Sequence, residues 1–156
     1  MTAEVNLDAL IPREDFNVVE DNSGSARPQT VSIRDLEKNS FFYPLLRKPD
    51  FQRETGQWDQ ERICQFIQSF LNGDLIPAII LWTSGNYLFV IDGAHRLSAL
   101  IAWVHNDYGD GEISRNFFQH VIPVEQIEIA GKTRKYINQE ILSYEDYLYA
   151  RLSPQL

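Results

Sequence analysis

The sequence predicts an α+β domain, in which a hairpin of apolar strands lies between two amphipathic helices along the chain. Three observations support this class. Apolar residues recur at helical spacing after Asp59, two apolar runs of strand length follow, and a second helical pattern begins directly after the hairpin. A chain of 156 residues, of which 44% are hydrophobic, is long enough to bury one core.

The first 30 residues predict a flexible N-terminal arm, because they show no sustained helical or strand period. We place the start of the domain at residue 31. Ser32 then precedes residues 33–37, where a hydroxyl cap and acids in the first turn favour a short helix. Residues 41–46 indicate apolar packing in irregular backbone, since Pro44 has no N–H to donate to a sheet.

The first long helix is predicted from its N-cap, Asp59, to the closing pair Asn72-Gly73. Its apolar residues recur three or four positions apart, which places them on one face: Ile63, Phe66, Ile67, Phe70 and Leu71. Cys64 is the single cysteine and lies in this stretch. Because it has no partner for an internal disulfide, we expect a reducing, cytoplasmic setting.

The hairpin is predicted from apolar runs at residues 78–82 and 87–91, which are separated by the turn residues Ser84-Gly85-Asn86. We expect both faces of these strands to be buried. A second helix is predicted from residue 93 to about residue 104, with its apolar residues on one face. Asp92 therefore stands at a strand-to-helix junction.

The C-terminal third of the chain gives a weaker pattern. Residues 121–129 alternate enough to predict a strand, and Ser143 can cap a helix that reaches Leu152. We expect the domain to cover residues 31–130, followed by a helical extension over residues 131–156.

The overall charge limits the partners that this chain can bind unaided. Fourteen basic and 22 acidic side chains give a formal charge of −8, so the surface as a whole repels a DNA backbone. We therefore expect any DNA contact to be indirect, through another part of a larger assembly. No apolar run approaches the roughly 20 residues of a membrane-spanning helix, so we expect no membrane contact.

The residues with the clearest chemistry are Asp92-Gly93-Ala94-His95-Arg96. Glycine allows close backbone approach, and the free N–H groups at a helix start favour an anion. Positive charge in the first turn opposes the helix dipole by about 0.3–1 kcal/mol, a cost that a bound phosphate would offset. In the alternative reading, Asp92 caps the helix and pairs with Arg96, and His95 is a surface residue.

A second basic element is Phe51-Gln52-Arg53, in a polar loop ahead of the first long helix. Arginine suits phosphate recognition, because its fork matches two oxygens at once. A lone loop arginine is more often a solvated charge, so this element gains meaning only in combination with others.

Together these elements resemble a known family. The order Phe51-Gln52-Arg53, Trp58, Ile76-Pro77 and residues 92–97 is similar to the succession QR…W, IP, DGQQRL of GmrSD-like restriction proteins, over about residues 31–105. The resemblance implies a ParB/sulfiredoxin-like fold from the N-terminus of such proteins. That fold is a compact α+β domain with a small mixed sheet flanked by helices.

The resemblance also implies a ligand and a role. The ligand is a nucleoside triphosphate, with Mg²⁺ as its candidate companion. For hydrolysis, Asp92 and His95 are the candidate catalytic residues. The role is regulation of DNA restriction in anti-phage defence, with a nuclease domain or partner protein. The residues implied to bind the nucleotide are Gln52, Arg53, Asp92, Gly93, Ala94, His95 and Arg96.

Two other activities are not supported by the residues. Ala94 stands where sulfiredoxins carry their catalytic cysteine, so we expect no sulfinic-acid reductase. The three histidines show no metal-ligand spacing, so we expect no metal site built by the protein and no nuclease. A different class stays open, a non-catalytic DNA- or protein-interaction module of a defence complex in which the turn at residues 92–96 is structural. The sequence leaves the preferred base and the oligomeric state open.

Overall fold

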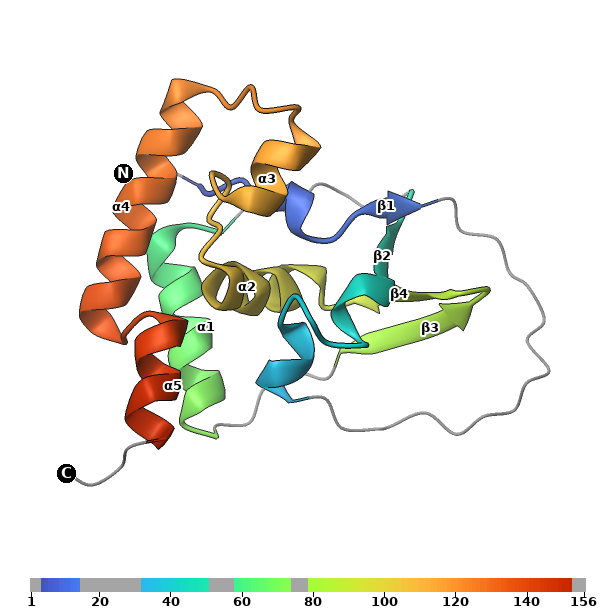
Figure 1. Ribbon diagram of the computed structural model, residues 1–156, viewed down its shortest axis with the longest axis horizontal. Helices are drawn as coiled ribbons and strands as arrows, with labels where there is room; N and C mark the ends of the chain where they lie inside the picture. The colour runs from blue at the N-terminus through green and yellow to red at the C-terminus, as the bar shows by residue number, and fades with distance from the viewer. Residues whose placement is uncertain (1–3, 15–31, 51–57, 74–78, 153–156) are drawn as a thin grey trace.

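The computed structural model describes residues 4–14, 32–50, 58–73 and 79–152. Over these residues the chain forms a mixed four-stranded sheet, five α-helices and short 3-10 helices, which confirms the predicted α+β class. Figure 1 shows the sheet on one side of the molecule, helices α1, α4 and α5 on the other, and α2 between them.

The sheet has the strand order β1-β2-β4-β3. Strands β1 (Arg13–Glu14) and β2 (Leu46–Pro49) pair in parallel, and β2 pairs in parallel with β4 (Tyr87–Asp92). Strand β3 (Ile80–Ser84) pairs antiparallel with β4, which confirms the predicted hairpin. The two short parallel strands were not expected from the sequence.

Strand β3 is an edge strand of the described sheet, and its outward side chains meet solvent. Ile80 is 53% exposed and Trp82 is 47% exposed, whereas Val90 on the inner strand β4 is 0% exposed. The prediction that both faces of the hairpin are buried is therefore wrong for β3. The apolar run alone did not distinguish an inner strand from an edge strand.

Helices α1 (Gln60–Leu71) and α2 (Ala94–His105) form where the periodicity predicted them. Asp59 caps α1 through its side-chain Oδ1, which accepts a hydrogen bond of 3.0 Å from the N–H of Arg62. Two-thirds of the α2 side chains are buried, on several faces of the helix, as expected for a central helix. This central position fixes both ends of α2 against the rest of the domain.

The C-terminal part is helical throughout its described length. The three helices are α3 (Glu112–Phe117), α4 (Val124–Glu140) and α5 (Tyr144–Leu152). The strand predicted at residues 121–129 is therefore wrong, because most of it forms the start of α4. The α4 residues that become buried are Ala130, Thr133 and Ile137, at helical spacing, and burial along this face outweighs the local alternation. The boundary expected after residue 130 also falls inside α4.

At α5, the predicted cap forms, since the Ser143 hydroxyl accepts a 3.1 Å hydrogen bond from the N–H of Asp146.

Residues 4–14 differ from the flexible arm expected for residues 1–30, since they pack into the domain. The N–H of Val5 donates a 3.0 Å hydrogen bond to the Trp58 carbonyl, and a 3-10 helix, η1 (Asp8–Leu10), follows. The buried residues of this segment are Val5, Leu7, Ala9, Leu10 and Ile11. Their irregular spacing gave no helical or strand period. Residues 15–31 lie outside the described residues.

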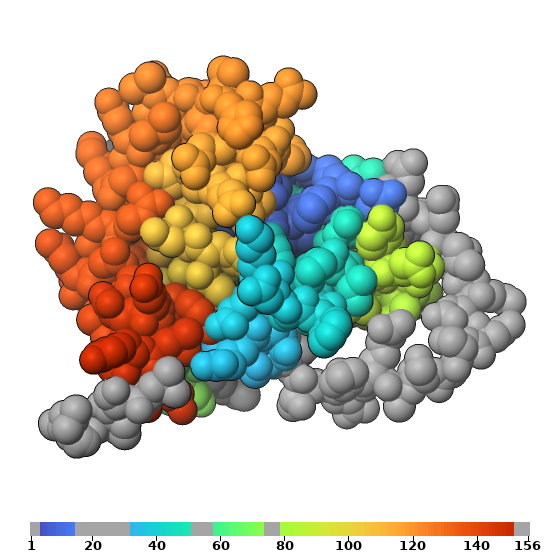
Figure 2. Space-filling view, viewed as in Figure 1, coloured from blue at the N-terminus to red at the C-terminus, as the bar shows by residue number. Residues whose placement is uncertain are grey.

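Residues 32–50 form two 3-10 helices, η2 (Ile33–Leu36) and η3 (Tyr43–Leu45), before β2 begins. The Asp35 carboxylate accepts a 2.8 Å hydrogen bond from the N–H of Ser32, so the predicted short helix is confirmed as a 3-10 turn. Figure 2 shows this segment on the molecular surface between α5 and β3.

Candidate anion site at the start of helix α2

The junction between β4 and α2 depends on Gly93, which is the N-cap residue of the helix. Gly93 has φ 104°, in the left-handed region that glycine adopts without strain. A Cβ at this position would lie 2.8 Å from Cγ1 of Ile79, so no larger residue fits without a shift. The chain therefore turns sharply from the strand into the helix at the one residue without a side chain.

The N-terminus of α2, which is the positive end of its dipole, has no acidic cap. Gly93 supplies no capping side chain, and the first turn of the helix contains no acidic residue. The first N–H groups of a helix and its macrodipole together favour a negative charge in front of it. This end of α2 is thus electrostatically suited to an anion.

His95 lies in the first turn of α2 and packs against Trp58, with ring centroids 5.9 Å apart and planes 23° from parallel. Its Nε2 atom is buried and has no hydrogen-bond partner in the described part of the chain. Burial lowers the pKa of His95, and the positive charges of Arg62, Lys48 and Arg96 lower it further. The imidazole is therefore neutral at pH 7, and three cations act at the start of α2.

Arg96 contacts Asp92, the last residue of β4, four positions earlier in the chain. Its Nη2 lies 3.6 Å from Oδ2 of Asp92, which is too long for a hydrogen bond. The Arg96 side chain is 19% exposed and that of Asp92 is 63% exposed. This contact is the one that the structural reading of the turn predicts, and an ion pair of this exposure is weak.

Two cations near this junction were missed from the sequence, Lys48 on β2 and Arg62 on α1. Lys48 is fully buried, and its Nζ donates to Oδ1 of Asp8 at 2.6 Å and to the Asp8 carbonyl at 2.9 Å. Arg62 is exposed, and its guanidinium carbon lies 4.6 Å from the centre of the Trp58 ring. Residues 58 and 62 are four positions apart at a helix start, a spacing that could have indicated the Arg62 contact.

The structure brings Asp92, Gly93, Ala94, His95 and Arg96 together, since they are consecutive at the junction. The other two predicted residues, Gln52 and Arg53, lie outside the described residues. Among the residues that the structure describes, no group of three or more His, Cys, Asp or Glu side chains could hold a metal ion. None of the helices in that part of the chain is long and apolar enough to cross a membrane.

These features define a class of protein, a small α+β domain whose central helix begins at a glycine junction with a basic first turn. Residues 33–154 match the family model described as GmrSD restriction endonuclease, N-terminal domain, and the chain belongs to this family. The family resemblance seen in the sequence is therefore confirmed. No curated protein and no solved structure matches the chain. The ParB/sulfiredoxin-like description of the fold is still a prediction.

Proposed function

We propose that this domain binds a nucleoside triphosphate at the start of α2. The single observation that carries the proposal is the geometry of the β4–α2 junction, where the start of α2 has no side-chain cap and no acid in its first turn. Arg62, Lys48 and Arg96 lie close enough to this start to lower the pKa of His95, after the larger effect of burial. The helix N-terminus adds its own partial positive charge at the same place. Such a concentration of positive charge favours a ligand with several negative charges.

Each group has a distinct part in the proposed complex. The N–H groups of Ala94 and His95 bind a phosphate oxygen, and Gly93 lets the phosphate approach the backbone. Arg96 exchanges its long contact with Asp92 for the phosphate, and Arg62 binds from α1. Lys48 stays paired with Asp8 and contributes at longer range. Gln52 and Arg53 are assigned to the phosphates from the family resemblance.

The same proposal gives this domain a regulatory role in restriction. The family description names a restriction endonuclease, and the described residues include no group of three or more His, Cys, Asp or Glu side chains that could hold a metal ion. We infer that nucleotide binding here controls cleavage by a nuclease domain or partner protein in anti-phage defence. With a formal charge of −8, the domain contacts DNA only through that partner.

For triphosphate hydrolysis, we assign Asp92 and His95. The exposed Asp92 carboxylate is accessible to the Mg²⁺ that accompanies a triphosphate. Because the pKa of His95 is lowered, its neutral ring donates a hydrogen bond to a phosphate or water rather than a proton. If Asp92→Ala and His95→Ala both release phosphate at the wild-type rate, any hydrolysis occurs elsewhere.

Isothermal titration with ATP, GTP, CTP and UTP in the presence of Mg²⁺ tests the binding proposal. We expect at least one nucleotide to bind, and Arg96→Ala to weaken that binding about tenfold, as the loss of a charge-assisted hydrogen bond does. Arg62→Ala should weaken it about threefold. Lys132→Ala is the matched control, because Lys132 is an exposed cation on α4 and its removal changes the net charge equally.

Absence of binding by all four nucleotides in a folded sample would contradict the proposal. Equal losses in Arg96→Ala, Arg62→Ala and Lys132→Ala would show that only net charge matters, and would remove the site from α2.

A second candidate function is an interaction module without a nucleotide. The Asp92–Arg96 contact and the stacking of His95 on Trp58 favour it, since both give the turn a structural use. A crystal grown with inorganic phosphate separates the two. An anion within hydrogen-bond reach of the Ala94 N–H, with Arg96 turned toward it, supports the nucleotide site, whereas an unchanged Asp92–Arg96 contact supports the module.

A further inference from the structure

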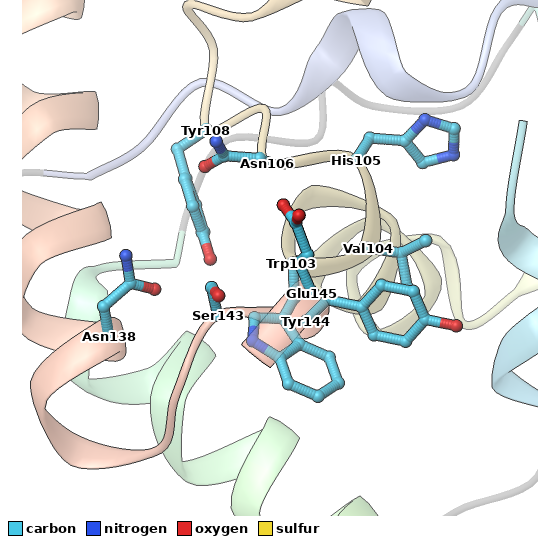
Figure 3. A pocket seen from close by; sticks show the side chains of 9 residues that line it. All are labelled: Trp103, Val104, His105, Asn106, Tyr108, Asn138, Ser143, Tyr144 and Glu145. Atoms are coloured by element: carbon cyan, nitrogen blue, oxygen red, sulfur yellow. The ribbon is translucent and has the colours of Figure 1, made fainter. Parts of the chain in front are cut away.

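A cavity of about 260 Å³ lies at the opposite end of α2 from Gly93. It is lined by the last turn of α2, by Tyr108, and by the ends of α4 and α5 that meet there (Figure 3). Helix α2 has 12 residues, so the two ends are about 18 Å apart. The cavity is thus separate from the anion site.

The Tyr108 side chain is largely buried and lines the cavity. Tyr108 is 1% exposed. The guanidinium of Arg134 lies over its ring, with the guanidinium carbon 5.3 Å from the ring centre. Figure 3 shows the Tyr108 hydroxyl directed toward the region of Ser143. A tyrosine hydroxyl can both donate and accept a hydrogen bond, so it can accept one from a donor group of a ligand in the cavity.

The charge of the cavity lining is negative. Glu145 is the ionised side chain that lines it, because burial lowers the pKa of His105 and leaves that ring neutral at pH 7. The nearby cation, Arg134, is already engaged, with Nη2 2.6 Å from Oδ1 of Asp110 and Nε 2.6 Å from Oδ1 of Asn106. A positively charged ligand would therefore gain from Glu145, and none of the described residues that line the cavity is a lysine or arginine.

The dipoles of two of the three helices at the cavity also favour a positively charged ligand. Helices α2 and α4 both end at the cavity, so the negative ends of their dipoles lie there. Helix α5 begins at the cavity with its positive end, but Glu145 and Asp146 stand in its first turn and the Ser143 hydroxyl caps the Asp146 N–H. The opposing contribution of α5 is thus largely compensated within its own first turn.

Aromatic rings complete the lining. Trp103 and Tyr144 pack edge to face, with ring centroids 5.2 Å apart, and both line the cavity with Tyr108 (Figure 3). Aromatic rings attract cations, and a planar guanidinium combines this attraction with several hydrogen-bond donors. The amide of Asn138 and the Glu145 carboxylate supply acceptors at the same place. This combination suits a guanidinium better than a compact, strongly hydrated ammonium.

We propose that this cavity binds the guanidinium group of an arginine side chain from a protein partner. The volume of about 260 Å³ lies below the roughly 300–1,000 Å³ of pockets that enclose whole small molecules, and it suits the end of one side chain. The proposal is independent of nucleotide binding at Gly93. It gives the domain a protein-docking point at the negative end of the helix whose positive end carries the anion site.

Titration of the full chain with N-acetyl-arginine amide, followed by ¹H–¹⁵N NMR, tests the proposal. We expect saturable shifts of the Trp103 indole N–H and of the amides of Asn106 and Ser143. N-acetyl-citrulline amide is the matched ligand control, because it has the same shape without the charge. Spermidine separates a guanidinium site from a general polyamine site.

Two variants make the test specific to this cavity. Glu145→Gln should weaken binding about fivefold, whereas Glu128→Gln, an equal change of charge on exposed α4 surface, should leave it unchanged. Tyr108→Phe should also weaken binding, because it removes an acceptor oxygen from the cavity lining and leaves the ring in place. Equal shifts with citrulline, tighter binding of spermidine than of arginine, or identical affinities of the two glutamine variants would each overturn the proposal.

Discussion

Replacement of Gly93 by alanine tests the β4–α2 junction directly, because two independent effects act there. Gly93 has φ 104°, and a side chain in the left-handed region costs about 1–2 kcal/mol. Its Cβ would also lie 2.8 Å from Cγ1 of Ile79, and relief of such overpacking costs about 1–3 kcal/mol. We therefore expect Gly93→Ala to lower the free energy of unfolding by about 2–5 kcal/mol.

Urea denaturation followed by circular dichroism measures this change. With a dependence of about 2 kcal/mol per molar urea, the unfolding midpoint should fall by about 1–2.5 M at an unchanged slope. An altered slope would instead indicate a change in the native or unfolded ensemble, and the midpoint could not then be read as stability alone.

Gly131→Ala is the matched control. Gly131 lies inside α4, and a Cβ there meets no atom within 4 Å, so alanine should stabilise the helix by about 0.5–1 kcal/mol. The two substitutions are chemically identical and should have opposite signs. A Gly93→Ala protein as stable as Gly131→Ala would refute the geometric account of the junction.

Three further predictions concern buried polar groups. Asp107 is 0% exposed and accepts four hydrogen bonds from the following loop and α3, so Asp107→Ala should lower the free energy of unfolding by about 3–5 kcal/mol in thermal denaturation. The folded pKa of His95 lies below 6.5, so stability should fall as the pH drops from 6.5 toward that pKa, and His95→Gln should flatten this part of the profile, measured by urea denaturation between pH 5 and 8. Burial raises the pKa of Cys64 to about 11, so a thiol reagent at pH 8 should label it at the rate of unfolding, and rapid labelling of the native protein would contradict its burial.

The elements that the sequence predicted well are those whose signals are local. Helix α1 carries its own cap at Asp59 and a continuous apolar face, and the hairpin carries its turn at Gly85. Helix α2 follows because Gly93 stops the strand and an apolar helical pattern begins at once. In each case the information lies within about 12 residues, so no distant contact is needed to interpret it.

The elements that were missed depend on distant partners. Strand β1 has two residues and β2 has four, and both exist because they pair in parallel with strands far along the chain. Residues 121–129 alternate like a strand, but the burial of Ala130, Thr133 and Ile137 beyond them selects a helix. Such choices are made by tertiary packing, which a short sequence window does not contain.

The candidate site also has one part that was predicted from the sequence and one part that was not. Residues 92–96 were found because they are consecutive, whereas Lys48 and Arg62 reach His95 from other elements. Lys48 also resembled an ordinary surface lysine in sequence, since its partner Asp8 lies 40 residues earlier. The position of Lys48 could therefore be found only from the fold, whereas the spacing of Arg62 from Trp58 could have indicated the Arg62 contact.

The Asp92–Arg96 contact does not by itself decide between a structural turn and a ligand site. Exposed ion pairs contribute about 0–1 kcal/mol, whereas a hydrogen bond to a charged group contributes about 1.5–3 kcal/mol. A phosphate that reached the helix N-terminus and one arginine would therefore displace a 3.6 Å contact to the 63% exposed Asp92. Until then, the contact holds Arg96 beside the junction, which reduces the side-chain entropy lost on binding. In the empty protein, Arg96 thus forms a weak ion pair with Asp92 at the start of the helix. In the proposed complex, the same arginine is already close to the place where it binds the phosphate.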